Sequence, residues 1–255
     1  MWWGREGLDD VPGEGVGMSH GTTDPDEPTA ARRLALLNIV ASVAFFVGGS
    51  LFALGAYFAQ RDIGSLTTVN VTYLVGGFFF SLGGYTSVVI ASNLTVSARM
   101  RWWSTQPARR DWASAVVLFA GTIFFAVSLV SAFAEGLTPR QSNGWIWLPD
   151  IIGCVCFLAS GHLAMLAVGA GHVVVRVHEL TWWVVVVNQV GSVLFFLAGV
   201  AAFTRPATSS AVDIGLVNWG TFAGAVCFAI GGLVQIFDKP TPTRTVVRPS
   251  HDQAH

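Results

Sequence analysis

The sequence predicts an all-α integral membrane protein with six transmembrane helices, arranged as three tandem helical hairpins of the same polarity. Three observations lead to this prediction: a chain of 255 residues with only 11% charged side chains, six long apolar stretches, and a residue pattern that recurs along the chain. Soluble domains carry about 25% charged residues. The shortage of charge therefore indicates that lipid surrounds most of the molecule.

Six apolar stretches are long enough to cross a bilayer, which takes about 20 helical residues. They cover residues 34–59, 69–92, 112–134, 145–170, 182–203 and 215–237. The alternative, buried core helices of a soluble protein, would leave too little polar surface to cover six such stretches. In lipid each backbone N–H and C=O must be paired within its own segment, so we expect every stretch to be a helix.

The two ends of the chain are predicted to be disordered tails. Residues 1–33 are rich in Gly, Pro, Asp and Glu, and residues 238–255 are polar and interrupted by proline. Neither tail has enough apolar residues to build a packed structure. The first tail also lacks the apolar core of a signal peptide. Translation from Met1 and translation from Met18 are both compatible with the sequence.

The basic residues predict the orientation in the membrane. Eleven Lys and Arg lie in the two tails and in the loops 93–111 and 171–181, whereas the remaining loops hold three, namely Arg61, Arg140 and Arg205. Cytoplasmic loops carry the excess of Lys and Arg in membrane proteins. We therefore expect both termini to be cytoplasmic.

A repeated pattern links the first and fifth stretches. Residues 38–49 read NIVASVAFFVGG and residues 188–199 read NQVGSVLFFLAG. The shared Asn, small residue, Ser, Phe, Phe and Gly fall at offsets that an α-helix gathers onto one face. The third stretch carries a weaker copy: Val117, Ala120, Gly121, Phe124, Phe125 and Ser128.

The even-numbered stretches share a second pattern. Asn70, Gly76, Phe80, Gly83 and Gly84 match Asn218, Gly224, Phe228, Gly231 and Gly232, and the fourth stretch has Trp147, Gly153, Phe157, Ser160 and Gly161 in the same register. Repeats of this kind indicate tandem structural units. We predict three parallel hairpins, covering residues 34–92, 112–170 and 182–237, of which the second has diverged.

The repeated faces are predicted to be helix-packing surfaces. Small residues let helix backbones approach closely, and Asn or Ser can form hydrogen bonds across the contact. The predicted packing residues are Asn38, Ser42, Gly49, Gly76, Gly83, Asn188, Ser192, Gly199, Gly220, Gly224 and Gly231. The alternative is that Asn38, Asn70, Asn188 and Asn218 line a polar path.

Residues 187–199, VNQVGSVLFFLAG, followed by NWGTFAGAVCFAIGGLVQIF at 218–237, resemble the YrhK-like domain family of small bacterial membrane proteins. The resemblance is best over residues 184–237, weaker over 37–91 and poor over 112–170. Three copies in one chain depart from the single unit of that family. The resemblance implies a bacterial cell membrane location, and no catalytic residue comes with it because the family has no assigned activity.

Motifs of enzymatic chemistry are missing from the sequence. It has no phosphate-binding loop, no nucleophile elbow and no zinc-protease helix. Cys154, Cys156 and Cys227 fall within apolar stretches and are predicted to pack there, and His172 and His178 flank Arg176 in a loop that we interpret as a membrane-surface connector rather than a metal site. We therefore expect no enzyme activity, no cofactor and no metal. The net charge of −1 argues against nucleic-acid binding.

Two ionisable residues, Asp150 and His162, stand out within the second hairpin. Such residues are costly in lipid and usually serve a function. The first hypothesis is a non-enzymatic structural or partner-binding protein, whose partners are the bilayer and a second copy or another membrane protein. The alternative is a small-solute or ion transporter or channel, with Asp150 and His162 as stations about 18 Å apart on a polar path. A membrane enzyme is a third, less favoured class.

Overall fold

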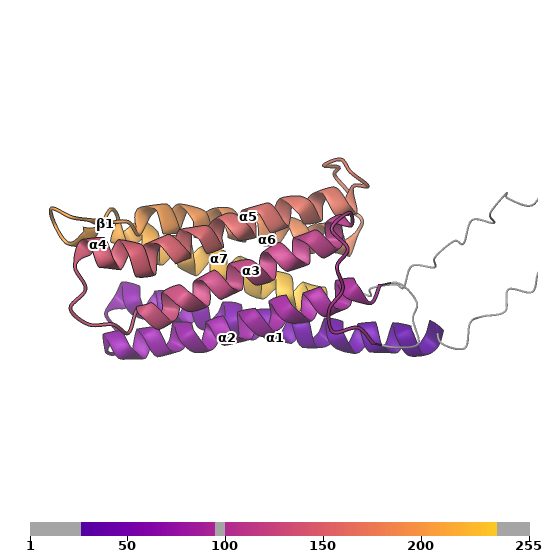
Figure 1. Cartoon of the computed structure of the whole chain (residues 1–255), viewed down its shortest axis with the longest axis horizontal. Coiled ribbons are helices and arrows are strands. Elements are labelled where there is room, and N and C mark those ends of the chain that lie inside the picture. The colour runs from indigo at the N-terminus through magenta and orange to yellow at the C-terminus, as the bar shows by residue number, and fades with distance from the viewer. Residues whose placement is uncertain (1–26, 95–99, 239–255) are drawn as a thin grey trace, which may run out of the picture.

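Six long helices form the described part of the chain, residues 27–94 and 100–238 of a computed structural model (Figure 1). The predicted tails beyond these residues lie outside the description. The long helices are α1 (Glu27–Arg61), α2 (Leu66–Ser92), α3 (Arg110–Ser131), α5 (Leu148–Val168), α6 (Leu180–Ala201) and α7 (Ile214–Gln235). All six transmembrane candidates are long and apolar enough to cross a bilayer. The predicted class, an all-α multi-pass membrane protein with six transmembrane helices, is confirmed.

Short elements connect the helices at one end of the bundle. The helix α4 (Pro139–Ser142) and the π-helix η1 (Asn143–Trp147) lead into α5, and the strands β1 (Thr204–Arg205) and β2 (Ser210–Ala211) form a small antiparallel pair between α6 and α7. We call this end the loop end. The opposite end, where α1 begins and α7 finishes, is the terminal end (Figure 1).

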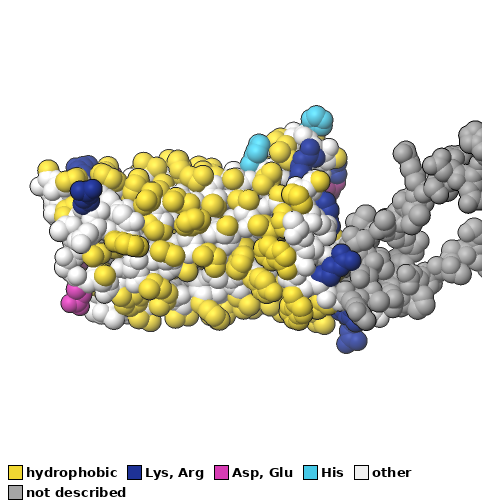
Figure 2. All heavy atoms as spheres, viewed as in Figure 1, with side chains coloured by type: hydrophobic (Ala, Val, Ile, Leu, Met, Phe, Trp, Pro, Cys, Tyr) yellow, Lys and Arg dark blue, Asp and Glu magenta, His cyan; other side chains and the backbone are white. Residues whose placement is uncertain are grey.

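The six long helices form a closed ring. Each helix packs against its two neighbours in the order α1, α2, α3, α5, α6, α7, and α7 packs against α1. The three hairpins α1–α2, α3–α5 and α6–α7 therefore surround one axis. Hydrophobic side chains cover the long side of the bundle, whereas Lys and Arg gather at its two ends (Figure 2). This distribution suits a bilayer around the middle of the bundle.

A phenylalanine core closes the middle of the ring. Each long helix contributes at least one buried phenylalanine: Phe45, Phe80, Phe125, Phe157, Phe195 and Phe228. Phe52 of α1 joins them. Neighbouring rings lie close, with centroids 5.0 Å apart for Phe125 and Phe157 and 5.4 Å apart for Phe80 and Phe228. Tilted and edge-on pairs at such distances are favourable for aromatic rings.

The buried face of α3 differs by one residue from its predicted alignment. The sequence pattern aligns Phe124 with Phe45 and Phe195. In the structure Phe125 is the ring that is buried with them, at 6% exposure, whereas Phe124 is 38% exposed. Thr122 accordingly takes the place of Ser42 and Ser192 on the buried face. Two adjacent phenylalanines fit either alignment in the sequence, and packing around the axis decides between them.

Glycines bring neighbouring helices into close contact. A Cβ added at Gly49 would lie 2.7 Å from the backbone N of Ala229 on α7, and one added at Gly224 would lie 2.9 Å from the carbonyl O of Gly191 on α6. Cβ atoms do not come this close to backbone atoms, so both positions require glycine. The other predicted packing glycines also face a neighbouring helix: Gly76 and Gly83 face α1, Gly199 faces α5, and Gly220 and Gly231 face α6.

The first helix begins earlier than expected. The disordered tail was predicted to reach residue 33, whereas α1 starts at Glu27. Proline is tolerated in the first turn of a helix, which is where Pro28 lies. The following residues, TAARRLALL, are mostly good helix formers, so the helix continues into the apolar stretch without a break.

Candidate functional site

A cavity of about 310 Å³ lies between the phenylalanine core and the terminal end. All six long helices contribute to its wall. Phe45, Phe157 and Phe228 form its floor, and Asp111 and Thr181 lie at its mouth near the starts of α3 and α6. Its volume is at the lower end of the range of small-molecule sites. This cavity is the candidate functional site of the described chain.

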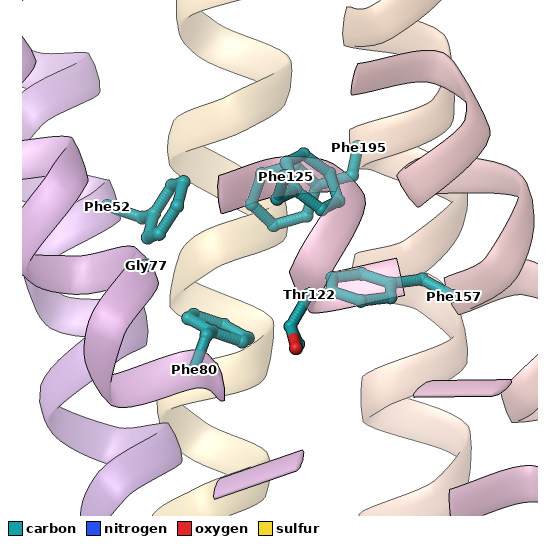
Figure 3. A pocket seen from close by; sticks show the side chains of 7 residues that line it. All are labelled: Phe52, Gly77, Phe80, Thr122, Phe125, Phe157 and Phe195. Atoms are coloured by element: carbon teal, nitrogen blue, oxygen red, sulfur yellow. The ribbon is translucent and has the colours of Figure 1, made fainter. Parts of the chain in front are cut away.

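The phenylalanine core separates the cavity from the loop end. A void of only about 10 Å³ remains within the core, and its lining residues are Phe52, Gly77, Phe80, Thr122, Phe125, Phe157 and Phe195 (Figure 3). A cavity needs about 10–15 Å³ and several polar partners to hold one water molecule. Thr122 supplies the one hydroxyl among these side chains, and it donates to the carbonyl of Phe119 at 2.7 Å, while the rings offer no hydrogen-bond partner (Figure 3). The core therefore leaves no water path along the axis.

Asn38 holds the terminal end of α7 against α1 beside the cavity. Its Nδ2 donates to the carbonyl oxygens of Gln235 and Asp238, each at 2.8 Å, and its Oδ1 accepts from Nε2 of Gln235 at 3.0 Å. Carbonyl groups at a helix C-terminus have no partner within the helix. Asn38 therefore joins α1 to the end of α7 through three hydrogen bonds.

Two serines join α3 and α5 in the cavity wall. The Ser114 hydroxyl donates to the carbonyl of Ser160 at 2.9 Å, the Ser160 hydroxyl donates to the carbonyl of Ser114 at 2.9 Å, and the two hydroxyl oxygens lie 3.1 Å apart. Ser192 donates to the carbonyl of Asn188 at 2.9 Å. These lining hydroxyls are thus held by the protein itself.

The interior of the cavity carries little charge. Among the lining residues that the structure describes, Asp111 is the one ionisable side chain, and it pairs with Arg109 at the mouth. Thr181 donates to the carboxylate of Asp238 at 2.9 Å and 3.0 Å. A ligand deep in the cavity therefore meets no opposite charge from these residues.

Asp150 lies on the other side of the phenylalanine core. It is half-buried in the first turn of α5 and faces α6, because a Cβ added at Gly199 would lie 3.2 Å from its Oδ2. Asp150 makes no hydrogen bond or ion pair with any other residue in the described ranges 27–94 and 100–238. It does not line the cavity.

His162 is exposed on the outer surface of α5, whereas Ser160 and Ala164 of the same helix line the cavity. The structure therefore does not bring Asp150 and His162 onto one path. The four asparagines are separated as well: Asn38 and Asn188 line the cavity, but Asn70 lies at the loop end, where its Nδ2 donates to the carbonyl of Ala132 at 2.9 Å. Asn218 is buried near the start of α7 at that end too.

No family model matches the chain, and comparison with curated proteins and with solved structures gave no match either. The resemblance to YrhK-like domains stays a prediction. Among the described residues no three His, Cys, Asp or Glu side chains come together as a metal site would require. The cavity could not be predicted from the sequence, because its wall combines residues of all six long helices.

Proposed function

We propose that this protein is a non-enzymatic, multi-pass membrane protein that binds a small molecule in the cavity at its terminal end. The observation that carries the proposal is a cavity of about 310 Å³, walled by six helices and closed on one side by phenylalanine rings. Its serines are held by backbone carbonyls, as structural serines are. This arrangement favours binding over catalysis, since a nucleophilic serine needs an adjacent base.

The orientation of the cavity belongs to the same proposal. The excess of Lys and Arg at the terminal end favours a cytoplasmic location of both termini. The cavity would then open toward the cytoplasm. We also propose that the protein lies in a bacterial cell membrane, that its hairpins are three repeats of one unit, and that it is related to YrhK-like domains. The residue patterns at 38–49 and 188–199 support this.

A melting experiment tests the proposed function. The protein, purified in lipid nanodiscs, is heated with a library of metabolites and ions, and a compound that binds only the folded state raises the melting temperature. Ala164 lines the cavity, whereas Ala159 of the same helix is exposed. We expect Ala164→Trp to abolish the response to a hit and Ala159→Trp to retain it. Equal responses of both variants would place binding outside the cavity.

Transport is the second candidate, and Asp150 is the observation that favours it. A carboxyl group within a membrane span is costly and usually functional. Transport would require the phenylalanine core to open between the cavity and Asp150. We expect Asp150→Asn to leave ligand binding intact and to abolish uptake into proteoliposomes under a proton gradient. Uptake by the variant at the wild-type rate would remove Asp150 from any such mechanism.

A further inference from the structure

Asn188 is the one polar side chain of the cavity wall that has no hydrogen-bond partner among the described residues. The other polar lining side chains, Asn38, Ser87, Asp111, Ser114, Ser160, Thr181, Ser192 and Gln235, all bond to the protein. The Oδ1 atom of Asn188 is buried without a partner. An amide left in this state inside a protein loses the energy of its bonds to water.

The contrast with Asn38 shows that an unpartnered amide is not a general feature of this position in the predicted repeat. The two asparagines have the same position in the predicted repeat. Both amide atoms of Asn38 form hydrogen bonds with residues at the end of α7. Asn188 instead lies against Gly231 of α7, which leaves room for its amide because it lacks a side chain. Its Oδ1 is buried there without a partner, its Nδ2 forms no hydrogen bond with any described residue either, and Asn188 lines the cavity.

The free amide can offer the cavity either a donor or an acceptor, because a half-turn of the side-chain amide exchanges its N and O atoms. A hydroxyl group is both donor and acceptor, so it can pair with the amide in both states. A simple ether only accepts hydrogen bonds and a quaternary ammonium group has no N–H to donate, so neither can pair with the amide in both states. One hydroxyl is the ligand group that best matches this wall.

The rest of the cavity selects an uncharged, largely apolar ligand. The floor is aromatic, and much of the wall between floor and mouth is aliphatic: Ile90, Ala91, Ala115, Leu118, Ala164, Ala167, Val184 and Val185. A charged ligand would lose its hydration there without gaining a counter-ion from the described lining. An aromatic ring would meet the edges and faces of Phe45, Phe157 and Phe228 in the geometries that aromatic pairs favour.

We propose that the cavity binds an uncharged phenol, with its ring on the phenylalanine floor and its hydroxyl hydrogen-bonded to the Asn188 amide. This inference rests on the proposed function and names the ligand class of the same site.

Fluorine NMR of purified protein in nanodiscs tests the proposal with three probes. The probes are 4-fluorophenol, 4-fluorotoluene, which has the same shape without the hydroxyl, and 4-fluorobenzoate, which is charged. Empty nanodiscs and the Ala164→Trp variant correct each probe for partition into lipid. We expect 4-fluorophenol to bind most tightly and 4-fluorobenzoate not to bind.

Asn188→Leu should weaken the binding of 4-fluorophenol about tenfold, which corresponds to about 1.4 kcal/mol, and leave the affinity for 4-fluorotoluene unchanged. Retained 4-fluorotoluene binding also shows that the variant is folded. Gln189→Leu is the matched control, because the Gln189 Oε1 is likewise buried and unpartnered but faces Gly161 and does not line the cavity. This change should alter neither affinity.

The outcomes separate the two proposals. Equal affinities for 4-fluorophenol and 4-fluorotoluene, or an Asn188→Leu variant that binds 4-fluorophenol like wild type, would overturn the hydroxyl contact. Failure of every aromatic probe, together with a library compound of another class whose binding Ala164→Trp abolishes, would overturn the phenol class and leave the proposed function standing. Failure of every compound to distinguish wild type from Ala164→Trp would overturn both.

Discussion

Single glycines decide how closely the helices of this ring can approach each other. Gly224 lies directly against the backbone of Gly191, so the contact between α7 and α6 is made by main-chain atoms. Membrane helices gain little from hydrophobic burial against one another, because lipid tails are equally apolar. Close van der Waals packing at such positions therefore supplies much of the association energy.

Gly224→Leu should destabilise the bundle by at least about 2 kcal/mol, because the larger side chain forces α6 and α7 apart. Gly144→Leu is the control, since a Cβ added at Gly144 meets no atom within 4 Å. Reversible unfolding in mixed micelles measures both variants. A Gly224→Leu protein as stable as Gly144→Leu would mean that this face of α7 is not a contact face.

The same kind of hydrogen bond joins the helices at two interfaces between successive hairpins. At the loop end, the start of the second helix of one hairpin donates a hydrogen bond to the end of the first helix of the next. Asn70 does so to the carbonyl of Ala132 at 2.9 Å, and the indole Nε1 of Trp147 does so to the carbonyl of Gly199 at 2.8 Å. The third interface, between α7 and α1, relies on Gly49 and Gly232.

Replacing Trp147 by Phe should cost about 1 kcal/mol, the typical value of a side-chain hydrogen bond between membrane helices. Trp145→Phe is the matched control, because Trp145 is 63% exposed and its indole is not among the described hydrogen bonds. The same unfolding assay compares them. Equal stabilities would show that the bond to Gly199 does not hold the second and third hairpins together.

The elements of this fold could be predicted more fully than its site. Length and hydropathy were enough for six spans, since each helix must satisfy its own backbone in lipid. The aligned positions of Asn70 and Trp147 were visible in the sequence, but their shared role as donors depends on which hairpin lies beside them. The same holds for Asn188, whose free amide follows from its position against Gly231 on another helix.

The whole molecule has two unlike ends. The cavity opens near the starts of α3 and α6 at the terminal end, where Arg101, Arg109, Arg110 and Arg176 lie, and the phenylalanine core closes the bundle toward the loop end. From this asymmetry we predict that a ligand reaches the cavity from one side of the membrane only.

Cysteine labelling tests the orientation that the basic residues predict. In a variant without native cysteines, single cysteines at Ser65, Ser142 and Ser209 of the loop end should react with an impermeant maleimide in intact cells, and one at Ser104 of the terminal end should not. Labelling at Ser104 alone would reverse the orientation.

A cysteine at Ala164 measures whether the cavity can be reached from one side of the membrane only. In a variant with Cys154, Cys156 and Cys227 replaced by Ala, a small charged thiol reagent is applied to each side of sealed vesicles. We predict that Ala164→Cys reacts from the side of the terminal end only, because the cavity admits water there and the phenylalanine core excludes it from the other side. The exposed, lipid-facing Ala159→Cys should react from neither side. An Ala164→Cys thiol that is inert from both sides would show that the cavity does not admit water, and one that also reacts from the loop end would show that the phenylalanine core does not close the bundle.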